Sequence, residues 1–269
     1  IKKNILAPRL ISQNYKNNYI EIEDFGDLTV FKKFQKKSIN KKIYYKKIIN
    51  LLISIKNIKT KYQKTFLKTN YKVPDYSLKK LLDESNLFLD WYLPKYIKRG
   101  KNIILKIKLN KIFKKLLNNI YYKNKVFVHR DFHISNLMIT KKGLGLIDSQ
   151  DAVYGNIAYD LASLIDDVRF KTDIKTKKYI FDEFIKKNKQ LNLKKFKNDF
   201  EILSVLRNLK IIGIFTRLSV RDKKNKYLKL IPHAWELIDY RTLNNPIFKD
   251  LKYLLSKNFD RKIRKSYEN

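Results

Sequence analysis

Residues 126–151 read VFVHRDFHISNLMITKKGLGLIDSQD, and this stretch decides the fold. Its first three residues are apolar and predict a short strand that runs into His129. Residues 137–140 and 144–147 predict a β-hairpin, because two apolar runs flank a Lys-Lys-Gly turn. The hairpin ends at Asp148. This order of elements predicts that the loop after the first strand and the end of the hairpin face the same cleft.

The loop after the first strand carries His129-Arg130-Asp131, and Asn136 follows five residues after Asp131. Phosphoryl transfer needs a carboxylate that orients the attacking hydroxyl, and oxygen ligands for the magnesium ion that bridges the phosphates. Asp131 is predicted to be the base, and Asn136 and Asp148 are predicted to be the metal ligands. The spacing H-R-D-x-x-x-x-N is the pattern of a kinase catalytic loop, and the flanking strand and hairpin supply its context. In the structural alternative, His129 is a buried hydrogen-bonded histidine and Asp131 is a turn residue.

Outside this segment the chain is mostly helical in pattern. Residues 19–23 alternate apolar and charged side chains, which predicts a strand, and Ser77 is predicted to be a helix N-cap. The predicted helices share apolar residues three and four apart, and they cover residues 31–56, 78–92, 105–122, 158–168, 179–187, 195–220 and 227–240. No Gly/Ser-rich linker divides the chain.

The charge is strongly positive, since 61 lysines and arginines against 25 acidic residues give a net charge of +36. Clustered basic residues favour binding to phosphate backbones. Here the lysines occur along nearly the whole chain, which favours a diffuse charge on solvated helix faces. We therefore predict no specific nucleic-acid partner, and a polyanion-binding role is the alternative.

The composition excludes several classes of site. The chain has no cysteine, so disulfides, thiolate metal sites and cysteine nucleophiles are excluded. No apolar run approaches the roughly 18 residues that a membrane span requires. These features fit the reducing cytoplasm and no membrane partner. Separately, we expect a monomer.

The motif segment resembles the aminoglycoside phosphotransferase and choline kinase superfamily, in which an Ile/Leu-Asp pair closes the hairpin. Within it, HRDFH (129–133) and IDSQDAVYG (147–155) resemble the branch of anomeric N-acetylmuramate/N-acetylglucosamine kinases of cell-wall recycling. Further segments that resemble this branch are Asn136-Leu137-Met138, YDL (159–161), EDFGD (23–27), FLDWY (88–92), GIFTRL (213–218), Arg221-Asp222 and Tyr227-Leu228. The resemblance spans most of the chain.

This resemblance implies an α+β, protein-kinase-like bilobal fold with an incomplete N-lobe and a mostly helical C-lobe around a small central hairpin. Residues 1–30 would be the remnant of the N-lobe with the hinge, and residues 31–269 would be the C-lobe with the catalytic loop and the acceptor site. The reaction it implies is transfer of the γ-phosphate of ATP, with Mg²⁺, to the C1 hydroxyl of the amino sugar.

The resemblance also assigns roles to residues outside the motif segment. The hinge beside the adenine would be formed by Glu23, Asp24, Phe25 and Gly26. Asp160, at the start of a helix, would brace the catalytic loop rather than touch the substrate.

One departure concerns the nucleotide phosphates. A kinase covers them with an N-lobe loop and neutralises them with a strand lysine paired to a helical glutamate, and neither feature is visible in this sequence. The chain begins at Ile1, and its only methionine is Met138. We therefore expect a fragment that binds ATP poorly, and activity that returns when roughly 60 N-terminal residues are restored.

Four residues are candidates for contact with the acceptor, each with a structural alternative. Trp91 offers an aromatic face for a sugar ring, and the alternative is a core aromatic. Arg217 and Arg221 lie one helical turn apart and would pair with a carboxylate, or they are solvated basic residues. For Asp151, structural and substrate-binding roles stay equally open.

Two rival functions remain at this stage. The acceptor could be choline, an aminoglycoside or another small alcohol, although a cationic substrate needs an acidic pocket. The chain could also be an inactive basic module that binds nucleic acid or an anionic partner. The intact set of Asp131, Asn136 and Asp148 argues against this second rival, because a binding module needs neither a base nor metal ligands.

Overall fold

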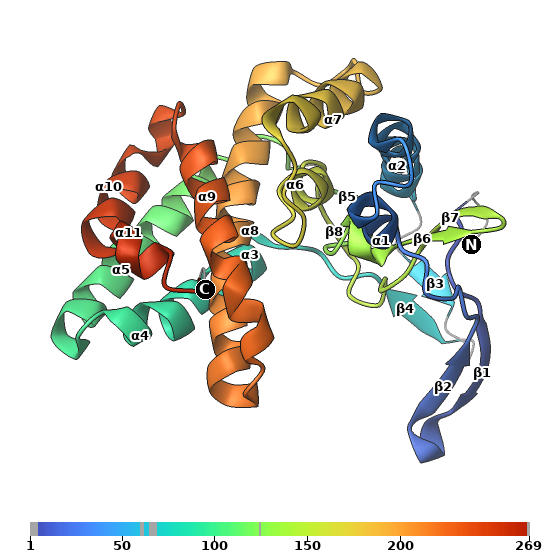
Figure 1. The fold of residues 1–269 in the computed structure, drawn as a ribbon, viewed down its shortest axis with the longest axis horizontal. Coiled ribbons are helices and arrows are strands. Elements are labelled where there is room, and N and C mark those ends of the chain that lie inside the picture. Colours follow the sequence, from blue (N-terminus) through green and yellow to red (C-terminus); the bar gives the residue numbers. More distant parts are fainter. Residues whose placement is uncertain (1–4, 60–61, 65–68, 124, 268–269) are drawn as a thin grey trace. The chain divides into compact units, whose positions relative to one another are not determined.

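The computed structural model describes residues 5–59, 62–64, 69–123 and 125–267 (Figure 1). The chain divides into two compact units, and each is assembled from segments that are distant in sequence. The first comprises Ile1–Asp75, Asn124–Ile165 and Thr172–Leu191, and the second comprises Tyr76–Lys123, Asp166–Lys171 and Asn192–Asn269. The predicted division at residue 30 is a different partition of the chain, and it stays a prediction.

In its described residues, the first unit contains antiparallel pairs of short strands. The pairs are β1 (Leu10–Asn14) with β2 (Tyr19–Ile22), β3 (Tyr62–Lys64) with β4 (Asn70–Lys72), β5 (Lys125–Val128) with β8 (Val153–Asn156), and β6 (Leu137–Thr140) with β7 (Gly143–Leu146). The predicted strand at residues 19–23 and the predicted hairpin are therefore confirmed. The partners β1 and β8 were not predicted, because strand pairing depends on contacts between distant parts of the chain.

The β6–β7 hairpin is crossed by the N-terminal segment of the first unit. The Ile139 amide donates to the Leu28 carbonyl at 2.7 Å, and the Leu146 amide donates to the Leu6 carbonyl at 2.8 Å. A Cβ atom at Gly145 would lie 2.7 Å from the Phe25 ring, so glycine leaves the room that this ring occupies. The predicted hinge segment therefore packs directly on the strand that leads to Asp148.

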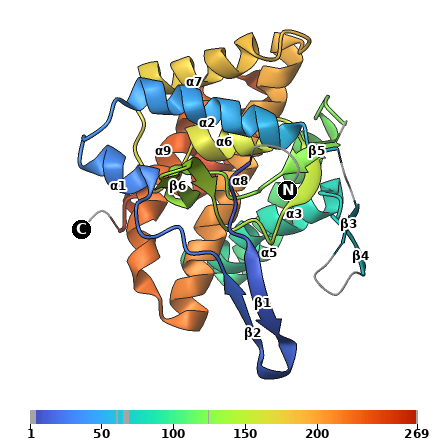
Figure 2. The ribbon, with the colours of Figure 1, turned by 90° about the vertical axis from the view of Figure 1, so that its right-hand side faces the viewer.

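The helices of the first unit are α1 (Val30–Gln35), α2 (Lys41–Lys56), α6 (Tyr159–Ile165) and α7 (Ile174–Lys186), and α2 lies beside α7 (Figures 1 and 2). The prediction of one helix over residues 31–56 was wrong, because the helix breaks between α1 and α2. Lys37 adopts a left-handed φ of 51° at the break. The Asn40 side chain then caps α2 by accepting from the Lys42 and Ile43 amides at 3.0 and 3.2 Å.

The second unit is helical. Its main elements are α3 (Leu78–Ser85), the π-helical turn η2 (Phe88–Tyr92), α4 (Leu93–Tyr96), α5 (Arg99–Asn118), α8 (Leu193–Asp222), α9 (Ile231–Thr242), α10 (Lys249–Asn258) and α11 (Arg261–Arg264). Ser77 caps α3 as predicted, since its Oγ accepts from the Lys80 amide at 3.1 Å. The prediction of one helix over residues 78–92 missed the π-helical turn η2. No helix was predicted at α10 or α11.

An aromatic cluster forms the core beneath η2. The rings of Phe88 and Tyr92 stack with their centroids 5.2 Å apart, and both lie within 6 Å of the Trp235 ring. The Trp235 Nε1–H donates to the Tyr92 hydroxyl at 3.2 Å. Burial raises the pKa of Tyr92 far above its usual value, so this hydroxyl stays neutral.

Gly213 of α8 lies directly against the backbone at the start of η2. A Cβ atom there would lie 2.3 Å from the Leu87 carbonyl carbon and 2.5 Å from the Phe88 nitrogen. Both atoms belong to the backbone, so neither can turn aside as the end of a side chain could.

Replacing Gly213 with alanine is therefore expected to lower the free energy of unfolding by about 1–3 kcal/mol or more, as overpacking does. Denaturant unfolding followed by circular dichroism measures the change. Gly100→Ala is the matched control, because nothing lies within 4 Å of a Cβ at this position in α5. The control is expected to gain roughly 0.5–1 kcal/mol. Equal midpoints and slopes for the two variants would contradict the prediction.

Among the described residues, none of the helices combines the length and the apolar character needed to span a bilayer.

Candidate functional site

The candidate catalytic loop runs from the end of β5 to the start of β6 in the first unit. Arg130, next to Asp131, has a φ of 75°, and Asp148 has a φ of 69°. These are left-handed conformations, which cost energy in any residue with a side chain and cluster at functional sites. The two strained residues are the neighbour of the predicted base and one of the predicted metal ligands.

Asp160, on the first turn of α6, holds the backbone of this loop. Its side chain is 2% exposed, and its two oxygens accept from the His129 amide at 2.7 Å and the Arg130 amide at 2.9 Å. A carboxylate bonded to two main-chain amides fixes the direction in which the loop leaves β5. The predicted bracing role of Asp160 is confirmed.

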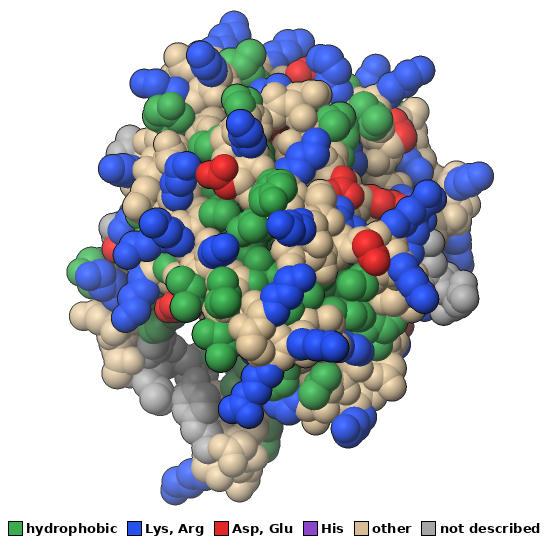
Figure 3. Space-filling model, turned by 90° about the vertical axis from the view of Figure 1, so that its left-hand side faces the viewer, with side chains coloured by type: hydrophobic (Ala, Val, Ile, Leu, Met, Phe, Trp, Pro, Cys, Tyr) green, Lys and Arg blue, Asp and Glu red, His purple; other side chains and the backbone are tan. Residues whose placement is uncertain are grey.

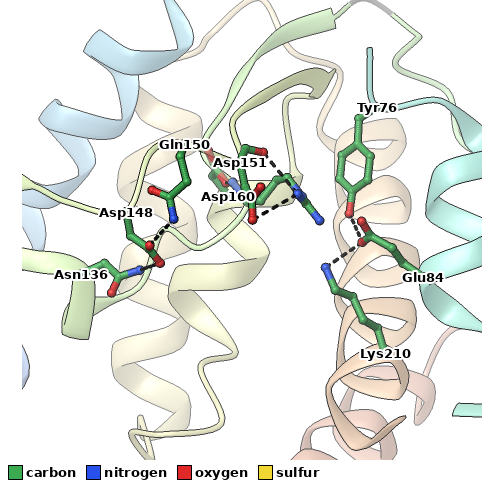
Figure 4. Close-up of polar contacts among 9 residues, drawn as sticks. Tyr76, Glu84, Asn136, Asp148, Gln150, Asp151, Asp160 and Lys210 are labelled. Carbon is green, nitrogen blue, oxygen red and sulfur yellow. Dashed lines mark hydrogen bonds and ion pairs between the residues drawn. The ribbon is translucent and has the colours of Figure 1, made fainter. Parts of the chain in front are cut away.

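The predicted metal ligands lie together at the base of the loop (Figure 4). Asn136 Nδ2 donates to the Asp131 main-chain oxygen at 3.1 Å and to Asp148 Oδ2 at 3.3 Å. The Asn136 carbonyl accepts from the Ile147 amide at 3.1 Å, which ties the loop to the end of the hairpin. The structure thus brings together Asp131, Asn136 and Asp148, which are up to 17 residues apart in sequence (148 − 131 = 17).

Gln150 is a member of the site that the sequence reasoning missed. Its Nε2 donates to Asp148 Oδ1 at 2.7 Å, so amide groups hold both oxygens of this carboxylate (Figure 4). The available signal was the position of Gln150 two residues after Asp148, in the turn that leaves the hairpin.

The donor set fits a magnesium ion that is also held by phosphates. Mg²⁺ takes hard oxygen ligands and usually keeps only one or two protein side chains, with phosphates and water completing the octahedron. The Asp148 carboxylate and the Asn136 side-chain carbonyl are such donors. In the part of the chain that the structure describes, no group of three or more His, Cys, Asp or Glu residues is arranged to hold a metal by itself. The site therefore fits an ion that arrives with a nucleotide.

His129 is a buried structural residue of the loop. Its ring Nε2–H donates to the Ile147 carbonyl at 3.0 Å, which fixes the tautomer. Burial lowers the pKa of His129 below its usual value, although the nearby Asp131 and Asp148 carboxylates act in the opposite direction. A neutral His129 therefore ties the catalytic loop to the strand that ends at Asp148.

Asp151 is paired with Arg130. The guanidinium Nη1 lies 3.3 Å from the Asp151 carbonyl oxygen and 3.9 Å from its Oδ2. The Asp151 side chain is 68% exposed, so its carboxylate is still open to solvent while it balances the arginine.

The predicted hinge forms a tight turn. Asp24 Oδ1 accepts from the Gly26 amide at 2.7 Å, and Gly26 has a φ of 70°, which favours glycine. Glu23 accepts from Arg9 Nε at 3.1 Å, and the bond to this guanidinium lowers the pKa of Glu23. The side chains of Glu23 and Asp24 are therefore engaged locally, and the predicted contact of this segment with adenine stays a prediction.

The other three predicted acceptor residues belong to the second unit. Trp91 lies in η2 and is half-buried. Arg217 is half-buried on α8, one turn before Arg221. The Arg221 guanidinium forms a bidentate pair with Asp222 at 2.7 and 2.9 Å, so its Nε and Nη2 donors are already bonded.

The second unit also has a shielded ion pair that the sequence did not predict. Glu84 accepts from Lys210 Nζ at 2.6 Å and from the Tyr76 hydroxyl (Figure 4). The side chains of Glu84 and Lys210 are each 14% exposed. This pair ties α3 to α8 within the helical unit.

Comparison with known proteins gives two kinds of match. Residues 70–185 match the phosphotransferase enzyme family. An N-acetylmuramate/N-acetylglucosamine kinase of Neisseria meningitidis is 36% identical over 169 residues, which are 60% of this chain and 50% of that protein. The enzyme of the same name from Pseudomonas aeruginosa is 24% identical over 256 residues, which are 93% of this chain and 72% of that protein. The matched region thus covers about half of the full length of the Neisseria relative.

A solved structure shows the same fold. A choline/ethanolamine kinase family protein from Mesorhizobium loti matches with a TM-score of 0.60 at 8% identity, over 93% of this chain and 77% of that one. At this identity the match concerns the fold alone. The predicted α+β, protein-kinase-like fold class is confirmed.

Proposed function

We propose that this chain, whose residues 70–185 match the phosphotransferase enzyme family, is an ATP-dependent kinase for the anomeric hydroxyl of N-acetylmuramate or N-acetylglucosamine. The observation that carries the proposal is the cluster of Asp131, Asn136 and Asp148 on a strained, braced loop. The sequence relatives of the same acceptor class support the choice of substrate.

Asp131 acts as the base in this proposal. Its carboxylate accepts a hydrogen bond from the C1 hydroxyl of the sugar, turns the oxygen toward the γ-phosphorus, and takes the proton as the new O–P bond forms. The bond from γ-phosphorus to the β–γ bridging oxygen breaks in the same step, and ADP leaves. Asn136 keeps the loop closed through its bond to the Asp131 main-chain oxygen.

Asp148 and Asn136 would hold the magnesium ion, which, when bound, neutralises charge on the β- and γ-phosphate oxygens. Gln150 restrains one oxygen of Asp148 at 2.7 Å, so the carboxylate is oriented before the nucleotide arrives. The turn formed by Glu23, Asp24, Phe25 and Gly26 would contact the adenine through its backbone.

The acceptor site and the cellular setting belong to the same proposal. Trp91 would pack on a sugar face, and Arg217 and Arg221 would meet the lactyl carboxylate of N-acetylmuramate. Arg221 would first have to leave Asp222. Asp151 would accept a sugar hydroxyl while paired with Arg130. The enzyme would work as a cytoplasmic monomer in peptidoglycan recycling, with no specific nucleic-acid partner.

The test is phosphate transfer from ATP, with Mg²⁺, to each of N-acetylmuramate, N-acetylglucosamine, choline and kanamycin. Phosphorus NMR identifies the product, since a phosphate on C1 couples to the anomeric proton. The assay uses the chain as it stands and a chimera in which roughly 60 residues from the N-lobe of a relative are placed before Ile1. Transfer to C1 of the amino sugars alone is the expected result. Transfer to choline or kanamycin would overturn the acceptor, and no transfer in either form would overturn the proposed activity.

A further inference from the structure

The outer face of α5 in the second unit is apolar where a solvated helix is usually polar. Ile103, Ile104 and Ile107 are 58%, 58% and 65% exposed. They are spaced one, three and four residues apart, so they form one continuous patch on the helix surface. The opposite face of α5 is buried in the core through Leu105, Leu109, Phe113, Leu116 and Leu117. Packing within the unit therefore does not explain the exposed isoleucines.

The charge around this patch is mostly positive, although Lys106 pairs with Asp90 at 2.7 Å and Lys115 pairs with Asp250 at 3.3 Å. The segment from Trp91 to Arg130 contains no aspartate or glutamate. Lys98, Arg99 and Lys101 are exposed at the start of α5, where the helix dipole already places positive charge and no acidic residue lies in the first turn. The remaining basic residues of the helix are Lys106, Lys108, Lys111, Lys114 and Lys115. Figure 3, which shows the face that carries α5, has hydrophobic side chains gathered between lysines and arginines that far outnumber acidic groups.

Three exposed isoleucines bordered by cations complement a surface that is anionic outside and apolar just beneath. A helix of this kind lies in the plane of a bilayer interface, with its apolar residues below the headgroups and its basic residues on the lipid phosphates. A second copy of the chain fits poorly, because the two basic faces would repel each other. Nucleic acid would engage the lysines but would leave the isoleucines in water.

We propose that the N-terminal half of α5 docks the protein on a membrane surface rich in anionic phospholipid, with Ile103, Ile104 and Ile107 entering the interface. Lys98, Arg99 and Lys101 bind the headgroup phosphates. The sequence alone predicted no membrane partner. The exposure of the three isoleucines in the structure changes that expectation. The docking is peripheral because only one face of the helix is available. The proposal is independent of the phosphoryl-transfer activity.

The first experiment is co-sedimentation of the whole chain with vesicles of phosphatidylcholine alone or of phosphatidylcholine mixed equally with phosphatidylglycerol. Binding is expected only to the anionic vesicles. The triple variant I103Q/I104Q/I107Q is expected to reduce the association constant at least about tenfold, because the apolar contribution is lost. The matched control is I11Q/I43Q/I174Q, whose isoleucines are similarly exposed at 55%, 54% and 64% but belong to the first unit. This control is expected to bind like the unmodified chain.

A second measurement reports insertion rather than adsorption. Because the chain has no cysteine, I104C or I174C can be labelled at one position with an environment-sensitive dye. The emission at position 104 is expected to shift to the blue on anionic vesicles, and the emission at position 174 is expected to stay unchanged.

A second pair of variants tests whether the basic residues at the start of α5 contribute to vesicle binding. K98Q/R99Q/K101Q is expected to weaken binding more than K175Q/K186Q/K189Q, although each removes three exposed charges from the chain. Equal binding by the patch and control variants, or an unshifted emission at position 104, would overturn the proposal and leave only adsorption by net charge. Isoleucine-dependent binding to an acidic polypeptide, without binding to vesicles, would also overturn it and assign a protein partner.

Discussion

Replacing Asp131 with asparagine is expected to lower the rate of phosphate transfer to the amino sugar by about 10²–10⁴-fold, the usual contribution of a positioned base. Asparagine has nearly the shape of aspartate, but it cannot accept the proton of the attacking hydroxyl. Asn136 bonds to the main-chain oxygen of residue 131, and this bond survives the substitution. The fold and the affinity for the acceptor should therefore be retained, and the loss should appear in kcat.

Steady-state kinetics with the activity assay above, together with thermal unfolding, measures both properties. Asp182→Asn is the matched control, because this carboxylate is exposed on α7 and is paired only with Lys178 among the described contacts. The control should retain full activity. Comparable turnover by Asp131→Asn and Asp182→Asn would show that Asp131 is not the base.

Replacing Asp160 with alanine is expected to lower the free energy of unfolding by about 3–6 kcal/mol. The carboxylate accepts two main-chain hydrogen bonds at 2.7 and 2.9 Å, and bonds to a charged group contribute about 1.5–3 kcal/mol each. The alanine variant leaves the amides of His129 and Arg130 without this acceptor. Denaturant unfolding measures the loss.

The Asp160→Asn variant distinguishes the effect of Asp160 on the position of the loop from its effect on the free energy of unfolding. An amide side chain retains one oxygen, so the stability loss should be smaller than that of alanine. The folded asparagine variant should still show a lower kcat, because the loop that carries Asp131 is less well fixed, while KM for the acceptor changes little. Full kcat in a folded Asp160 variant would limit this residue to a structural role.

The sequence was most informative where the chemistry is local. His129 to Asp148 span 20 residues (148 − 129 + 1 = 20), and the strand, loop and hairpin that carry them are short and strongly patterned. These elements, the turn of the hairpin and the N-cap at Ser77 are determined by residues that are close together in the sequence. For this reason the proximity of Asp131, Asn136 and Asp148 could be predicted without any tertiary information, while their roles remain a proposal.

The sequence was least informative where distant segments meet. The pairing of β5 with β8, and that of Glu84 with Lys210 across 126 residues, depend on packing that no local pattern reports. The break before Asn40 was missed because neither glycine nor proline marks it, although Ile39 is the only apolar residue in residues 35–42 and Asn40 caps the next helix. The exposure of Ile103, Ile104 and Ile107 was likewise hidden, since periodicity cannot tell which apolar residues of a helix remain in water.

The Asp160 brace also sets an order of events during synthesis and folding. The catalytic loop leaves β5, whose partner β8 begins at Val153, and the loop amides meet their acceptor only when Asp160 is in place. A contact across 31 residues forms later than a local turn, because the intervening chain must first close. A nascent chain that ends before α6 therefore contains all three chemical groups of the cluster, Asp131, Asn136 and Asp148, but not their arrangement. The amides of His129 and Arg130 can meet this acceptor only after Asp160 has been synthesised, so we expect the native arrangement of the loop to form late.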